Sequence, residues 1–112
     1  MHNKTLAELS AGLAVGDYSS TELTRTLLDR VERLDGETGL GLNSFVTVTA
    51  EQALAAAAAA DHQRAAGEGG PLTGIPMAHK DIFCTAGVRT SCGSRMLDNF
   101  IAPYDAAVVS RC

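Results

Sequence analysis

The sequence is poor in aromatic residues: it contains no tryptophan, two tyrosines and three phenylalanines in 112 residues. A hydrophobic core must therefore form from many smaller contacts between leucine, valine, isoleucine and alanine side chains. Hydrophobic residues still make up 46% of the chain and charged residues 20%, which is typical of a globular protein. A domain of this size folds with little margin of stability.

The sequence also lacks a long hydrophobic run. A membrane-spanning helix requires about 20 apolar residues, whereas the longest apolar stretch, residues 53–60, is alanine with a single leucine. The N-terminus leads into an amphipathic pattern and not into the apolar core and small-residue cleavage site of a signal peptide. We therefore expect a cytoplasmic protein that makes no contact with a membrane.

A cluster of basic residues is absent as well. The net charge is −4 and the acidic residues are spread along the chain, whereas binding to a nucleic-acid backbone needs a basic stripe or patch. Three cysteines, Cys84, Cys92 and Cys112, lack the paired short spacing of a zinc site, and we interpret them as reduced thiols. The glycines between residues 67 and 74 match no phosphate-binding loop. The sequence thus predicts no metal and no bound cofactor in this chain.

Three helices are predicted in the first 66 residues, each opened by a hydroxyl side chain with a glutamate or glutamine three residues later, which is the pattern of a capping box. The three pairs are Thr5 with Glu8, Ser19 with Glu22, and Thr49 with Gln52. Apolar residues at helical spacing or an alanine run follow each pair, and the helices are predicted to end at residues 16, 35–36 and about 66. The glycine-containing stretch 36–43 is predicted to be a loop.

Two segments have the pattern of β-strands. Residues 45–49 are alternating and rich in β-branched side chains, and residues 75–83 follow a glycine-rich connection at 67–74. A polar loop is predicted at 84–94, and Asp105 is predicted to cap a further helix. This order indicates an α/β fold in which N-terminal helices precede the first strands of a mostly parallel, mixed sheet flanked by helices. Because two or three strands cannot form such a sheet alone, we expect it to be incomplete in this chain and to continue beyond residue 112.

Lys80 is the unusual residue of the second predicted strand. Strand alternation places it on one face with Ala78 and Ile82, and Asp81 on the other. A lysine on an apolar face is costly as a cation, and desolvation favours the neutral amine that can act as a base. The alternative is a lysine at a strand end that reaches solvent along its aliphatic stem, and by ordinary residue usage alone this alternative is the more common. The neighbouring His79 is interpreted as packed or solvated, not as a ligand.

The sequence Pro-Leu-Thr-Gly-Ile-Pro-Met-Ala-His-Lys-Asp at residues 71–81 closely resembles the start of the amidase-signature region. In that family a Gly-Ile-Pro strand leads to an essential lysine followed by an aspartate. Residues 90–94, 103–106 and 108–109 continue the pattern in the same order and spacing. Ser91 is a small departure, because the family often has a threonine there, but the hydroxyl is kept.

Other parts of the chain resemble one branch of this family, the glutaminase subunits of tRNA-dependent amidotransferases. This likeness lies in the helical N-terminus and in residues 43–47, 81–85 and 96–100, so the resemblance covers nearly the whole chain. It implies that residues 1–112 are the N-terminal part of a single amidase-signature domain. Residues 1–66 would be its mainly helical beginning, and residues 67–112 the start of the core with the lysine strand.

The resemblance implies a catalytic triad of two serines and a lysine, in which Lys80 is the catalytic general base. A bridging serine with a cis peptide bond would relay the proton, and a second serine would attack the glutamine side-chain amide, form an acyl-enzyme and release ammonia. Backbone amides would stabilise the oxyanion. The family pattern places both serines downstream of residue 112, so Ser91 and Ser94 are interpreted as residues that shape a loop. The chain alone is then expected to be inactive.

The same resemblance implies that glutamine is the substrate and that the ammonia passes to a partner subunit. That partner would use ATP with magnesium to convert Glu-tRNA(Gln) to Gln-tRNA(Gln) and would make most of the tRNA contacts, within a heterotrimer in which two other subunits accompany the glutaminase. Two alternatives stay open. One is a free-standing amidase that hydrolyses small amides, and the other is a non-catalytic interaction module whose helices pack on another protein.

Overall fold

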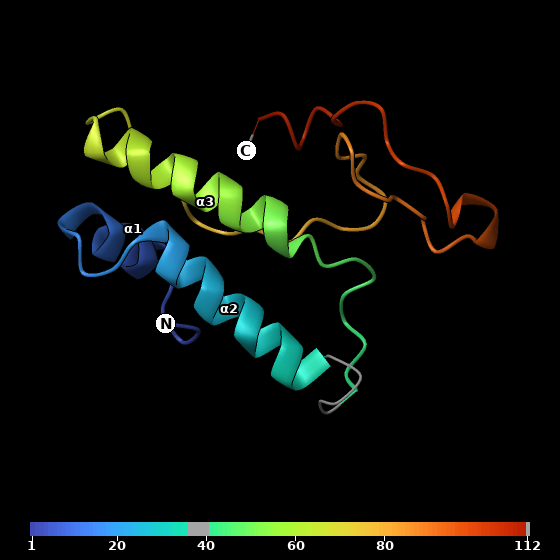
Figure 1. Ribbon diagram of the computed structural model, residues 1–112, viewed down its shortest axis with the longest axis horizontal. Helices are drawn as coiled ribbons and strands as arrows, with labels where there is room; N and C mark the ends of the chain where they lie inside the picture. Colours follow the sequence, from blue (N-terminus) through green and yellow to red (C-terminus); the bar gives the residue numbers. More distant parts are fainter. Residues whose placement is uncertain (36–40, 112) are drawn as a thin grey trace. The chain divides into compact units, whose positions relative to one another are not determined.

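The computed structural model describes residues 1–35 and 41–111. These residues form three α-helices and one 3-10 helix (Figure 1), namely α1 (Leu6–Val15), α2 (Ser20–Asp35), α3 (Ala50–Ala65) and η1 (Arg95–Leu97). The three helices predicted from the sequence are thus confirmed. The chain divides into two compact units, Met1–Pro76 and Met77–Cys112. None of the helices in the described ranges is both long and apolar enough to cross a lipid bilayer.

Two of the three predicted capping boxes form. At α1 the backbone N–H of Thr5 donates to the Glu8 carboxylate (2.6 Å), and the N–H of Glu8 donates to the Thr5 hydroxyl (3.3 Å). At α2 the same two bonds join Ser19 and Glu22, at 2.8 and 3.0 Å. At α3 the third prediction is only half right, because Thr49 is the N-cap residue but its side chain makes no capping bond.

The first unit is built on the packing of α2 against α3. Small residues on α3, Ala57 and Ala60, are buried and let the two helices approach closely. Asp61 on α3 also caps α2: its carboxylate accepts the backbone N–H groups of Ser20 (2.7 Å) and Thr21 (3.1 Å) and the hydroxyl of Thr21 (2.7 Å). The hydrophobic core of this unit consists of Leu13, Tyr18 and Leu23, with Leu9, Leu27 and Ile75 packed against them.

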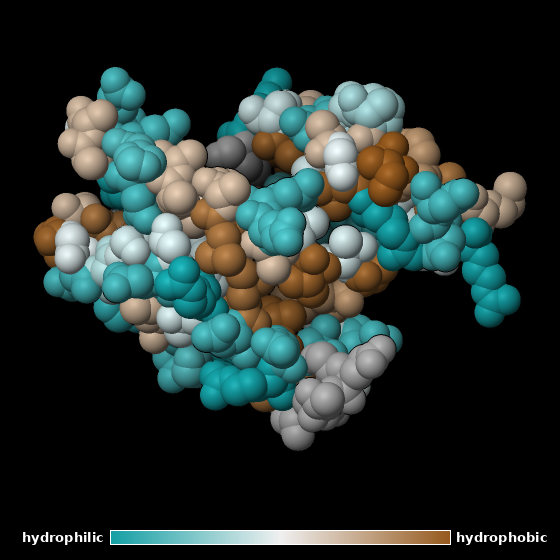
Figure 2. Space-filling model, in the orientation of Figure 1, coloured by the Kyte–Doolittle hydropathy of each residue, from teal (hydrophilic) through white to brown (hydrophobic). Residues whose placement is uncertain are grey.

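The second unit is held together mainly by hydrogen bonds between loops. Residues 87–90 and 100–102 run antiparallel, with Thr90 N–H donating to the Phe100 carbonyl (3.0 Å) and Ala102 N–H donating to the Val88 carbonyl (3.1 Å). An isolated antiparallel bridge pairs Arg89 with Ile101, and the Arg89 guanidinium forms an ion pair with Asp98. Several large apolar side chains of this unit stay exposed: Met77, Ile82, Met96, Ile101, Tyr104 and Val108. Figure 2 shows apolar side chains, in brown, that reach the surface of the molecule.

The two predicted strands do not form in the described part of the chain. Residues 45–49 and 75–83 contain no strand, and residues 81–82 lie in a turn closed by the Phe83 N–H and the Lys80 carbonyl (3.0 Å). The physical reason is that a strand is stabilised by backbone hydrogen bonds to a neighbouring strand, and the described residues supply no such neighbour. Residues 36–40 of the predicted loop 36–43 lie outside the described ranges.

The helix predicted after Asp105 is also absent from the described residues. The chain turns at residues 107–111 instead, with Val109 N–H donating to the Ala106 carbonyl (2.8 Å). The carboxylate of Asp105 accepts the backbone N–H of Ala86 (2.7 Å), so it joins two loops and does not cap a helix. A helix of two turns gains little from its own hydrogen bonds, which explains why the tertiary bond prevails.

Candidate functional site

Lys80, the residue that the sequence singles out, lies in the second unit at the start of a turn. Its side chain is exposed, and its backbone carbonyl accepts the N–H of Phe83 (3.0 Å). The prediction that Lys80 lies on the apolar face of a buried strand is therefore wrong for the described chain. The alternative interpretation placed Lys80 at the end of a strand with its amine in solvent; the side chain is exposed, but the described residues form no strand at 75–83.

The residue after Lys80 is tied to a loop ten residues further along the chain. One carboxylate oxygen of Asp81 accepts the backbone N–H of Ser91 (2.8 Å), and the other accepts the Ser91 hydroxyl. The backbone carbonyl of Asp81 accepts the N–H of Cys92 (2.9 Å). Both the side chain and the main chain of Asp81 thus hold the segment that starts at Ser91. We call residues 80–81 and 91–94 the Asp81 clamp.

The loop held by Asp81 is a tight turn with an uncommon backbone conformation. Cys92 and Gly93 have positive φ angles of 51° and 67°, and the N–H of Ser94 donates to the Ser91 carbonyl (2.8 Å). Positive φ at both central residues is the pattern of a type I′ turn. Gly93 adopts this conformation without strain, whereas Cys92 carries a Cβ atom and is strained by about 1–3 kcal/mol.

The hydrogen bonds of the clamp favour the ionised form of Asp81. The Ser91 hydroxyl, followed by the backbone N–H of Ser91, donates to this carboxylate and holds the pKa of Asp81 below its ordinary value, in spite of partial burial that acts in the opposite direction. The positive charge of Arg89 lowers the pKa further. Hydrogen bonds to an ionised acceptor are stronger than those between neutral groups.

The hydroxyls of the two serines in this loop make hydrogen bonds that stabilise its conformation. Ser91 is buried, and its hydroxyl both donates to Asp81 and accepts the N–H of Gly93 (3.3 Å). The Ser94 hydroxyl accepts the N–H of Met96 (3.3 Å) and caps η1. These bonds agree with the interpretation of both serines as loop-shaping residues. The bond between Asp81 and Ser91 was not predicted from the sequence, because a spacing of ten residues gives no periodic signal.

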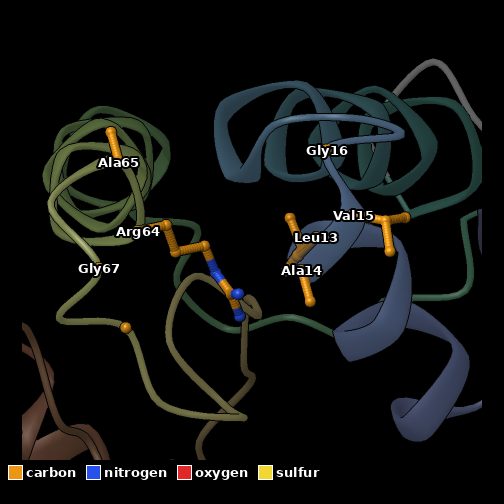
Figure 3. Close-up of a pocket in the computed structure, with 8 residues that line it drawn as sticks. Leu13, Ala14, Val15, Gly16, Arg64, Ala65 and Gly67 are labelled. Carbon is orange, nitrogen blue, oxygen red and sulfur yellow. The ribbon is translucent and has the colours of Figure 1, made fainter.

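The hollow shown in Figure 3 belongs to the first unit and contains none of the predicted site residues. It is lined by the end of α1 and the end of α3, with Arg64 extending from α3 into the space between them. The Arg64 guanidinium donates to the carbonyls of Thr73 (2.7 Å) and Gly70 (3.3 Å), so it fastens the connection that follows α3. We assign no chemistry to this hollow.

Two of the three cysteines lie in the described ranges. Cys84 and Cys92 are free thiols, half-buried and exposed respectively, while Cys112 lies outside those ranges. No group of three or more histidine, cysteine, aspartate or glutamate side chains in the described part of the chain is placed to hold a metal ion.

A comparison with family models matches residues 22–112 to the family described as Amidase. Among curated proteins, the chain is 72% identical over 99% of its length to the A subunit of glutamyl-tRNA(Gln) amidotransferase from Thioalkalivibrio sulfidiphilus, of which it covers 22%. It is 66% identical over 99% of its length to the protein of the same name from Methylococcus capsulatus, again covering 22% of the relative. The chain therefore spans little more than a fifth of the length of these relatives.

Solved structures resemble the chain as well. The peptide amidase PAM in complex with the competitive inhibitor chymostatin matches 97% of this chain with a TM-score of 0.90 and 38% identity, and 22% of that structure is covered. A structure described as a vestigial protein complex that reveals the evolutionary origins of an s-triazine catabolic enzyme matches 96% of the chain, with a TM-score of 0.86 and 34% identity, and 23% of it is covered.

Proposed function

We infer the function from the family of this chain: the chain belongs to the amidase family. The protein that contains it is the glutaminase subunit of a tRNA-dependent amidotransferase and releases ammonia from glutamine for the conversion of Glu-tRNA(Gln) to Gln-tRNA(Gln). The observation that carries the proposal is the 72% identity, over 99% of the chain, to a relative named as the A subunit of glutamyl-tRNA(Gln) amidotransferase. Because the chain covers 22% of that relative, the proposal concerns the whole protein.

In this proposal Lys80 is the general base. A serine downstream of residue 112 attacks the side-chain carbonyl carbon of glutamine, and its proton passes through a bridging serine to the neutral amine of Lys80. The same proton then returns to the leaving nitrogen, the carbon–nitrogen bond breaks, and ammonia departs from the acyl-enzyme, which water hydrolyses to glutamate. The exposure of Lys80 in this chain fits a residue whose partners come from another segment, and the bonds made by the Ser91 hydroxyl argue against that serine as the nucleophile.

The proposed reaction requires partners. The ammonia reaches a partner subunit that uses ATP with magnesium and makes most of the contacts to tRNA, in a cytoplasmic heterotrimer that contains a third subunit. The net charge of −4 supports the assignment of tRNA binding to the partner, because an acidic surface repels the phosphate backbone.

Replacement of Lys80 tests the proposed chemistry. In the full-length protein, Lys80→Ala should lower kcat for glutamine hydrolysis by about 10²–10⁴-fold, which is the contribution of a general base, while circular dichroism of the folded protein stays unchanged. Ammonia release provides the measurement. The chain has one other lysine, Lys4, whose amine lies 5.1 Å from the centre of the Tyr18 ring, and Lys4→Ala is the matched control that should retain activity. Normal turnover by Lys80→Ala would remove this residue from the mechanism.

The likeness to the peptide amidase PAM supports a second candidate function, a free-standing amidase. The two candidates differ in their need for partners. Glutaminase activity that rises when the other subunits are added would support the amidotransferase. Efficient hydrolysis of simple amides by the purified protein alone would support the amidase and contradict the first proposal.

A further inference from the structure

We propose that Asp81 is a positioning residue, whose hydrogen bonds to the turn at residues 91–94 fix the place of Lys80 in the active site. This inference rests on the proposed role of Lys80 as the general base. A base must lie within hydrogen-bond reach of the proton that it takes, and a displacement of about 1 Å can cost a factor of about 100 in rate. Lysine has a flexible four-carbon stem, so its reach depends on how firmly its backbone is held.

The first observation is the number of bonds on the residue next to Lys80. The carboxylate of Asp81 accepts the N–H (2.8 Å) and the hydroxyl of Ser91, and its carbonyl accepts the N–H of Cys92 (2.9 Å). The carbonyl of Lys80 itself accepts the N–H of Phe83 (3.0 Å). The backbone that carries the amine is therefore fixed on both sides of the peptide bond between Lys80 and Asp81.

The second observation is the strain in the turn. Cys92 has a φ of 51° although it carries a Cβ atom, a conformation that persists only where the surrounding structure enforces it. Its N–H is the donor to the Asp81 carbonyl, so the strained residue and the residue next to Lys80 are joined directly. A flexible loop would have relaxed to an unstrained conformation.

The third observation is that the bonds of the clamp are partly buried. Ser91 and the preceding Thr90 are 5% and 3% exposed, whereas most residues of the second unit are not buried. The Ser91 hydroxyl is shared between the Asp81 carboxylate and the N–H of Gly93. Its removal would leave both of those groups without this partner at once. Ser91 is thus the second half of the clamp, and its loss should have the same consequence as the loss of the carboxylate.

The test uses the full-length protein with glutamine as the substrate and ammonia release as the readout. Asp81→Asn keeps the size of the side chain but replaces one acceptor oxygen with a donor, and Ser91→Ala removes the hydroxyl. Each variant should lower kcat by about 10–100-fold and change KM by less than about twofold, because the base is displaced and substrate binding is not. The double variant should lose no more than the worse single variant, since both changes break one unit.

Two further variants serve as controls. Ser91→Thr keeps the hydroxyl and should restore kcat to within about threefold of the wild type. Asp98→Asn makes the same chemical change as Asp81→Asn at another aspartate of the second unit, whose exposed side chain pairs with Arg89, and should leave kcat unchanged. If Asp81→Asn does not fold, the comparison of Ser91→Ala with Ser91→Thr decides the question.

Three results would overturn the inference: a wild-type kcat in Asp81→Asn and Ser91→Ala, an equal loss in Asp98→Asn, or a loss in Ser91→Thr as large as in Ser91→Ala. The Lys80→Ala variant distinguishes failure of the inference about Asp81 from failure of the proposed function. If Lys80→Ala is inactive while Asp81→Asn is normal, only the role of Asp81 is wrong. If Lys80→Ala is fully active, the proposed chemistry itself fails.

Discussion

Gly74 lies where the connection after α3 passes close to the start of α2. Its φ is +83°, and a Cβ atom built on it would lie 2.9 Å from both Cβ and Oγ of Ser20 and 3.3 Å from Cβ of Ala60. The carbonyl of Gly74 also accepts the Ser20 hydroxyl (2.6 Å). A single residue without a side chain thus allows the backbone to approach two helices, which explains why glycine is required here for packing and not only for its conformational freedom.

Replacement of Gly74 by alanine should therefore destabilise the first unit more than backbone strain alone predicts. Gly16→Ala is the matched control, because Gly16 has a similar φ of +77° but nothing within 4 Å of a built Cβ atom. We expect Gly16→Ala to cost about 1–2 kcal/mol from left-handed strain and Gly74→Ala to cost about 1–3 kcal/mol more from overpacking. Urea unfolding of the two variants provides the measurement, and equal losses would contradict the packing argument.

The helix α2 depends on a residue of another helix at its N-terminus. The first turn of a helix has N–H groups without partners inside the helix, and Asp61 on α3 accepts two of them together with the Thr21 hydroxyl. Burial opposes ionisation of Asp61, but these bonds from Thr21 and Ser20 outweigh it and hold the pKa of the carboxyl below its ordinary value. The packing of α2 against α3 is thus linked to the protonation of Asp61.

The contribution of Asp61 to stability should consequently depend on pH. Because its pKa is lower in the folded than in the unfolded chain, where it is about 3.9, the stabilisation is fully present above pH 4 and is lost as the pH falls through the folded pKa. Asp61→Ala should cost about 0.5–2 kcal/mol at pH 7, as expected for loss of a helix cap, and should flatten the decline of unfolding free energy below pH 4. The exposed Asp17, replaced by asparagine, is the control and should keep the decline of the wild type. If the unfolding free energy of Asp61→Ala still declines below pH 4 like that of the wild type, the assignment to Asp61 is refuted.

The whole molecule consists of two units with different internal stabilisation. The buried hydrophobic residues Leu13, Tyr18, Leu23, Ala57 and Ala60 all belong to Met1–Pro76, whereas Ala102 is the buried hydrophobic residue described in Met77–Cys112. The second unit relies on hydrogen bonds between loops and on the Arg89–Asp98 ion pair. An exposed ion pair contributes little stability, so the two units should differ in how often they open.

Hydrogen exchange of the 112-residue chain expressed alone should reveal this difference. Amides of α2 and α3 should exchange more slowly than those of the second unit by about tenfold or more, because local opening is easiest where few apolar contacts are buried. Mass spectrometry of peptides from each unit gives the rates. Similar protection throughout the chain would show that the two units unfold together.

The positions of the three α-helices were determined by the sequence itself. The capping pairs Thr5 with Glu8 and Ser19 with Glu22, three residues apart, begin helices where they were expected, because a capping bond joins neighbours and needs no distant contact. The pattern around Lys80 and Asp81 likewise predicted the family that the comparison then matched. Local bonds and short motifs can be found in a sequence because their members lie a few residues apart.

Only the tertiary structure decided which distant groups meet. Asp61 reaches Ser20 across 41 residues, and Asp81 reaches Ser91 across 10, and neither separation carries a periodic signal. The predicted strands at 45–49 and 75–83 do not form, because they too depend on distant partners. β-Branched residues favour an extended backbone, but a strand forms only where a second segment accepts and donates its hydrogen bonds. A sequence reports what each segment prefers, whereas the contacts that satisfy the preference depend on the whole fold.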